Sequence, residues 1–84
     1  MKIIKISALW CPSCLIMNDL IEDVLSEKDV ELIKYDYDLD DEIVKKYNVG
    51  NILPVLIMVD DNNNEIKRIV GEHNKKEIIE FIEG

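Results

Sequence analysis

Two cysteines separated by two residues carry the most specific chemistry in this sequence. They stand in the segment Trp10-Cys11-Pro12-Ser13-Cys14, and the chain has no other cysteine. A thiolate attacks a disulfide, and a second thiol nearby can then displace the product, so this spacing suits thiol–disulfide exchange. Cys11 is therefore the candidate nucleophile, and Cys14 is the candidate resolving thiol.

The cysteine segment lies where a predicted strand leads into a predicted helix. Residues 2–8 are short, apolar and β-branched, whereas apolar residues between 15 and 25 recur every three or four positions. With Pro12 at the first helical position, Cys11 becomes the N-cap. Its sulfur then faces unpaired amides and the positive end of the helix dipole, which favour a thiolate. We therefore expect the Cys11 sulfur to reach solvent and Cys14, about one turn later, to be more enclosed.

The rest of the sequence predicts one α/β domain spanning residues 1–84, with the element order β-α-β-α-β-β-α. Apolar residues 55–59 form a nearly continuous run, as expected for a strand covered on both faces, and a polar turn follows at 60–64. The first two strands should be parallel, with a right-handed crossover, and the last two should form a hairpin. The predicted strands are 2–8, 30–37, 55–59 and 65–70; the predicted helices are 12–27, one beginning near Asp40, and one capped by Asn74 with Glu77.

Composition and charge restrict the possible partners. The chain has 84 residues, of which 48% are hydrophobic, and a net charge of −8. This composition is that of a folded globule, and the negative field disfavours nucleic acid and anionic membrane surfaces. No apolar run is long enough to span a membrane, and the apolar start is too short for a signal peptide. We therefore expect a cytoplasmic monomer without nucleic-acid or membrane partners.

Metal binding is a weaker interpretation of the cysteine pair. A structural zinc site needs four ligands, and one chain offers only two cysteines and His73. Two chains could share a zinc ion across a dimer, and two inert buried cysteines form a further alternative. His73 itself is expected at the surface or near a helix cap. The acidic stretch 36–42 lacks the glycine and terminal glutamate of a calcium loop, so we interpret it as a solvated face and helix cap.

The sequence resembles the thioredoxin superfamily over nearly its whole length. The resemblance rests on the segment 10–14, on residues 46–49 leading to Pro54 before an apolar strand, and on Gly71 before the last helix. It implies a thioredoxin-like fold with a four-stranded mixed sheet flanked by helices. It also implies a cis-proline at Pro54 that packs against the disulfide, with the backbone of Leu53 pairing with a substrate strand.

The same resemblance implies the remaining site residues. Trp10 would shield the sulfur from water and offer a flat apolar contact to partners. Pro12, Ser13 and Gly71 would complete the substrate-binding surface with Leu53 and Pro54.

The implied activity is reduction of protein disulfides through Cys11 and Cys14, with no bound cofactor and no metal. The partners would be disulfide-containing proteins and an external reductase, either a flavoprotein thioredoxin reductase or glutathione. Glutaredoxins grip anionic glutathione with basic groups and paired glycines, but here the segment 70–73 has one glycine and an added acid. The thioredoxin-like branch is therefore preferred. A glutathione-dependent reductase and a redox-inactive binding module on the same fold are the alternatives.

Lys5 departs from the family pattern. Thioredoxins bury an aspartate six residues before the first cysteine, where it helps move the proton of the second cysteine; this chain has Lys5 there. Because its neighbours are isoleucines, we expect Lys5 on an exposed face or with its stem along the surface. The alternative is a buried lysine that interacts with Cys14.

Overall fold

The computed structural model describes residues 2–83 and contains every predicted element in the predicted order. The first helix ends at Leu25 rather than near Glu27. None of the helices in the described part of the chain is long and apolar enough to cross a membrane. The elements are β1 (Lys2–Ser7), α1 (Pro12–Leu25), β2 (Glu31–Asp36), α2 (Asp41–Lys46), β3 (Val55–Val59), β4 (Glu65–Val70) and α3 (Lys75–Glu83).

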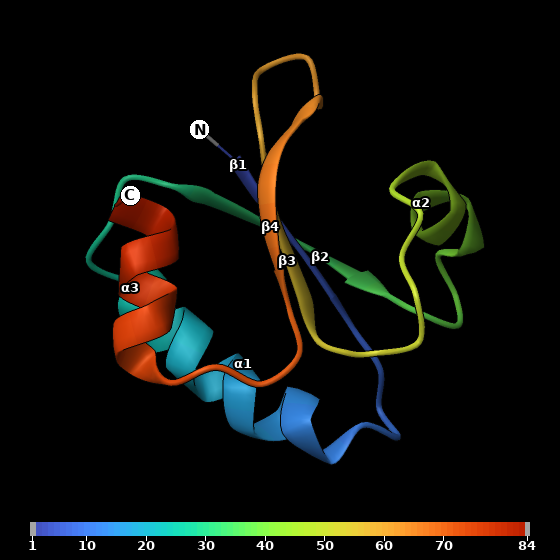
Figure 1. The fold of residues 1–84 in the computed structure, drawn as a ribbon, viewed down its shortest axis with the longest axis horizontal. Helices are drawn as coiled ribbons and strands as arrows, with labels where there is room; N and C mark the ends of the chain where they lie inside the picture. Colours follow the sequence, from blue (N-terminus) through green and yellow to red (C-terminus); the bar gives the residue numbers. More distant parts are fainter. Residues whose placement is uncertain (1, 84) are drawn as a thin grey trace.

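The four strands form one mixed sheet in the order β2-β1-β3-β4. β1 and β2 are parallel, whereas β1 with β3 and β3 with β4 are antiparallel. Figure 1 shows α1 and α3 on one side of this sheet and α2 on the other. The expected α/β architecture, the parallel first pair and the final hairpin are therefore confirmed.

Each face of the sheet has its own hydrophobic core, because successive side chains along a strand point to opposite faces. Ile3, Leu56 and Met58 pack with the apolar faces of α1 and α3. Ile4 and Ile57 belong to the second cluster, which includes both cysteines. Apolar side chains of α2 pack against this cluster. All five residues of β3 are buried, so the continuous apolar run correctly predicted a strand covered on both faces.

Polar residues close the hairpin and begin the last helix. Asn63 in the β3–β4 turn has a φ of 64°, a left-handed conformation that asparagine tolerates. At the start of α3, the Glu77 amide donates to Asn74 Oδ1 at 2.9 Å. The Asn74 amide donates in return to Glu77 Oε1 at 3.1 Å. The predicted capping box is therefore present and fixes where α3 begins.

Ile57 provides a test of the core. Its side chain is fully buried on the central strand β3, so Ile57→Ala removes apolar contacts and leaves a cavity. We expect the free energy of unfolding in urea to fall by about 2–5 kcal/mol. Ile66→Ala on β4 is the matched control, since 58% of Ile66 is exposed, and its effect should be about 1 kcal/mol or less. Equal losses for the two variants would contradict this assignment of the core.

Candidate active site

Cys11 is the N-cap of α1, as the position of Pro12 predicted. Its backbone is extended, with φ −98° and ψ 108°, and helical geometry begins at Pro12. The Cys11 sulfur accepts a hydrogen bond from the Cys14 amide at 3.2 Å. An amide that would otherwise lack a partner thus points at the sulfur, an arrangement that stabilises negative charge there.

A second contact joins Cys11 to the loop before β3. The Cys11 thiol donates to the carbonyl oxygen of Leu53, with 3.6 Å between sulfur and oxygen. The peptide bond between Leu53 and Pro54 is cis, as the family resemblance implied. Both residues are buried. The cysteine segment and the proline loop, far apart in the sequence, therefore form one site.

The two thiols differ in access to solvent, although less than expected. Cys11 is 6% exposed and Cys14 is fully buried, and both are free thiols. The predicted order of enclosure is confirmed. Cys11 nevertheless reaches solvent through a smaller area than the sequence suggested. The Leu53 carbonyl and the Cys14 amide both lie against its sulfur.

Burial, together with a smaller effect of the hydrogen bond with the Cys11 side chain, raises the pKa of the Cys14 thiol to about 11. The backbone of Ala8 and the charge of Lys5 act in the opposite direction and lower this pKa. Cys14 is therefore a protonated thiol at neutral pH in the reduced protein.

Trp10 projects beside the cysteines and is held by residues at the end of β2. Its ring is 57% exposed. The indole Nε1–H donates to Asp38 Oδ2 at 2.7 Å, and the ring packs edge-on against Tyr37 with 6.1 Å between centroids. The tryptophan thus presents an oriented apolar surface next to Cys11. No sequence pattern indicated Asp38 as its partner, because the two residues are 28 positions apart.

Gly71 is brought to the proline loop by the β3–β4 hairpin. Its amide donates to the Pro54 carbonyl at 2.9 Å, and its φ of +85° lies in the left-handed region that favours glycine. A Cβ at this position would lie 3.4 Å from Ile52 Cγ2. Ile52 is 60% exposed and was missed as a site residue, although an apolar side chain in a polar loop is a usable signal.

Pro12 and Ser13 begin α1 directly after Cys11. Pro12 is exposed and Ser13 is half-buried. Neither side chain makes a hydrogen bond to the proline loop in the described contacts. Their place in the site therefore follows from their position between the two cysteines.

Known proteins are similar to this chain in sequence and in fold. The family model described as Thioredoxin matches residues 1–84. The chain belongs to the thioredoxin family. It is 31% identical over 77 residues to a thioredoxin of Rickettsia bellii, covering 89% of this chain and 71% of that protein. It is also 31% identical over 74 residues to a thioredoxin of Mycobacterium tuberculosis, covering 86% of this chain and 62% of that protein.

Solved thioredoxin structures superimpose on nearly the whole chain. Thioredoxin 1 from Thermosipho africanus has a TM-score of 0.85 at 25% identity, with 99% of this chain and 91% of that chain covered. Fasciola hepatica thioredoxin has a TM-score of 0.85 at 26% identity, with 98% and 77% covered. As a thioredoxin with both cysteines present, the protein is a thiol–disulfide oxidoreductase. Its family implies disulfide-containing protein substrates and a reductase partner.

Lys5 lies in a different environment from the one that its sequence neighbours predicted. Only 3% of Lys5 is exposed, so the expectation of a surface lysine was wrong, and the alternative of a buried lysine is confirmed. Lys5 shares a face of the central strand β1 with Ile3, and α1 covers that face. Its ammonium donates to Asn18 Oδ1 at 2.7 Å. Burial lowers the pKa of Lys5, as does the nearby charge of Lys34, while Glu22 and Cys14 act in the opposite direction.

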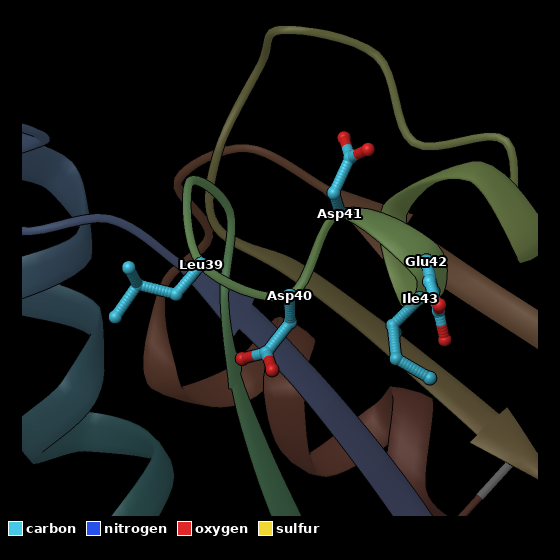
Figure 2. A pocket seen from close by; sticks show the side chains of 5 residues that line it. All are labelled: Leu39, Asp40, Asp41, Glu42 and Ile43. Carbon is cyan, nitrogen blue, oxygen red and sulfur yellow. The ribbon is translucent and has the colours of Figure 1, made fainter.

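A surface hollow of about 420 Å³ lies at the start of α2, lined by Leu39, Asp40, Asp41, Glu42 and Ile43. Figure 2 shows the carboxylates of Asp40 and Asp41 pointing away from each other. Asp40 accepts a hydrogen bond from the Asp36 amide at 2.7 Å and so stabilises the turn before α2. Within residues 2–83, no three His, Cys, Asp or Glu side chains converge as metal ligands would. Asp40 is the N-cap residue of α2, but its side chain makes no capping hydrogen bond, so the expected helix cap is not formed by this carboxylate.

Proposed function

We propose that this thioredoxin reduces disulfides of other proteins, with Cys11 as the nucleophile and Cys14 as the resolving thiol. The observation that carries the proposal is the contact between the Cys11 sulfur and the Cys14 amide at the first turn of α1. A donor fixed at this position favours the thiolate over the thiol, and the thiolate is the form that attacks a disulfide.

In the first step, the Cys11 thiolate attacks one sulfur of the partner's disulfide. A new bond forms between Cys11 and that sulfur, the partner's S–S bond breaks, and its second sulfur leaves as a thiolate. In the free protein, the Cys11 thiol donates a hydrogen bond to the Leu53 carbonyl. This hydrogen bond is lost when Cys11 loses its proton. That carbonyl is then available to a backbone amide of the substrate.

In the second step, Cys14 attacks the Cys11 sulfur of the mixed disulfide. The bond between Cys11 and the partner breaks, the Cys11–Cys14 disulfide forms, and the partner leaves fully reduced. The two electrons gained by the partner come from the two cysteines. Complete burial suits Cys14 to this role, because a thiol that external disulfides cannot reach reacts only with the adjacent sulfur.

The substrate surface surrounds the small exposed area of Cys11. We place on it Trp10, Pro12, Ser13, Leu53, Pro54 and Gly71. Exposed apolar side chains extend this surface on both sides, since Leu9 is 88% exposed and Ile52 is 60% exposed. A surface of this kind favours an extended apolar segment of a protein over a small hydrophilic disulfide.

For recycling, we propose a flavoprotein thioredoxin reductase rather than glutathione. The net charge of −8 repels an anionic peptide, and the segment 70–73 has only one glycine and an added acid. We further propose that the protein acts as a monomer in the cytoplasm, where thiol-reducing systems operate.

An insulin-reduction assay tests the proposal. With dithiothreitol as the electron source, we expect insulin to precipitate well before it does with dithiothreitol alone. With NADPH as the final donor, we expect turnover through thioredoxin reductase to exceed turnover through glutathione and glutathione reductase. A rate equal to that of free dithiothreitol would instead indicate a binding module without redox turnover. Faster turnover through glutathione would reverse the choice of reductase.

A further inference from the structure

Lys5 is a buried charged residue to which the two-cysteine cycle gives no role. Within residues 2–83, it is the only charged residue whose side chain is buried. Removing an ammonium group from water costs free energy unless other groups compensate for the lost hydration. The neighbours of this group therefore indicate what its charge does.

The hydrogen bond of Lys5 places its ammonium at the α1 side chain one turn after Cys14. The acceptor, Asn18 Oδ1, lies 2.7 Å from the ammonium nitrogen. Asn18 follows Cys14 by four positions on α1, so the two side chains share one face of the helix, at about 5–6 Å between Cβ atoms. The electrostatic interaction runs both ways: Lys5 lowers the pKa of Cys14, and Cys14 raises that of Lys5.

The other charged groups around Lys5 compensate each other at the surface. Lys34 is its register neighbour on β2, and Glu22 lies one further turn along α1. These two form an ion pair of 2.6 Å with both side chains more than half exposed. The β3 neighbour, Leu56, is apolar. Lys5 is thus bound by a neutral amide, and Cys14 is the buried ionisable group whose pKa the Lys5 charge lowers.

We propose that Lys5 is a positioning residue for the second step, in which its ammonium stabilises the Cys14 thiolate as this attacks the mixed disulfide on Cys11. The role rests on the proposed division of labour between the cysteines. The proton of Cys14 ends on the departing partner thiol, directly or through solvent, and Lys5 keeps its own proton throughout. The reaction then converts one disulfide and one thiol into another disulfide and another thiol, with nothing else consumed.

This stabilisation applies mainly to the second step. In the reduced protein, negative charge on Cys11 raises the pKa of Cys14, because two negative sulfurs side by side repel each other. In the mixed disulfide, Cys11 is neutral, so this repulsion is gone and the Lys5 charge acts on Cys14 alone. Asn18 keeps the ammonium on the same helix face as Cys14 during this change.

The two steps can be timed separately with one equivalent of dithiobis(nitrobenzoate). Attack by Cys11 releases a first coloured thiolate, and attack by Cys14 on the resulting adduct releases the second. In Lys5→Met, which keeps the length of the side chain without its charge, we expect the second release to slow about tenfold at pH 7. Its pH profile should move upward by about one unit, since one pKa unit is a tenfold change in thiolate. The first release should change by less than about twofold.

Lys34→Met is the matched control, because it removes a lysine from the neighbouring position on β2, and its second release should keep the profile of the starting protein. Lys5→Arg keeps the charge and should restore the profile. Asn18→Ala provides a second variant if Lys5→Met does not fold, and it should move the profile in the same direction.

Three results would overturn the proposal. The first is a Lys5→Met variant whose second release keeps the original rate and pH profile. Equal slowing of both releases would assign Lys5 a purely structural role. A starting protein that releases only one equivalent would show that the proposed roles of the cysteines are themselves wrong, and the role of Lys5 with them.

Discussion

Cys11→Ser should reduce the rate of insulin reduction to that of dithiothreitol alone. A serine hydroxyl does not ionise near neutral pH and does not form a disulfide, so neither step of the exchange remains. Cys14 cannot substitute for the lost nucleophile. It is fully buried, and this burial, which the variant keeps, raises the pKa of its thiol.

The same variant should remain folded, which makes loss of activity interpretable. Serine is a favourable N-cap residue, and its hydroxyl oxygen can accept from the amide that now donates to the Cys11 sulfur. We therefore expect the midpoint of thermal unfolding to stay close to that of the unchanged protein. Activity above the dithiothreitol background in folded Cys11→Ser would mean that the nucleophile has been wrongly assigned.

Local patterns were sufficient to predict the parts of the site that depend on one segment of chain. The N-cap position of Cys11 follows from Pro12 at the first helical residue, and the start of α3 follows from Asn74 and Glu77. In each case, the residues that decide the geometry are close together in the sequence. The helix-capping propensities of these residues were therefore enough to predict where both helices begin.

Contacts between distant segments could not be predicted in the same way. Lys5 was expected at the surface because its sequence neighbours do not reveal that α1 covers its face of β1. The bond between Trp10 and Asp38 and the closeness of Ile52 to Gly71 likewise depend on how β2 and the proline loop meet the first turn of α1. The narrow access to Cys11 has the same origin, because the Leu53 carbonyl belongs to that loop. The family resemblance supplied the cis-proline, which composition alone did not indicate.

Cys14→Ser should capture substrates as stable mixed disulfides on Cys11. The group that stabilises the Cys11 thiolate is the backbone amide of residue 14, and this substitution leaves it in place. The first step therefore proceeds, whereas the thiol that would release the partner is missing. The adduct should persist until an external thiol is added, and multiple turnover of insulin should fall close to background.

Mass spectrometry after incubation with a disulfide-bonded peptide measures this result. We expect one peptide mass added to nearly all Cys14→Ser molecules and removed by dithiothreitol. Cys11→Ser is the matched control, because it also keeps a single cysteine, and it should remain almost unmodified. Adducts on both variants in similar yield would contradict distinct roles. They would mean that burial does not protect the Cys14 sulfur from external disulfides, and that either cysteine can begin the exchange.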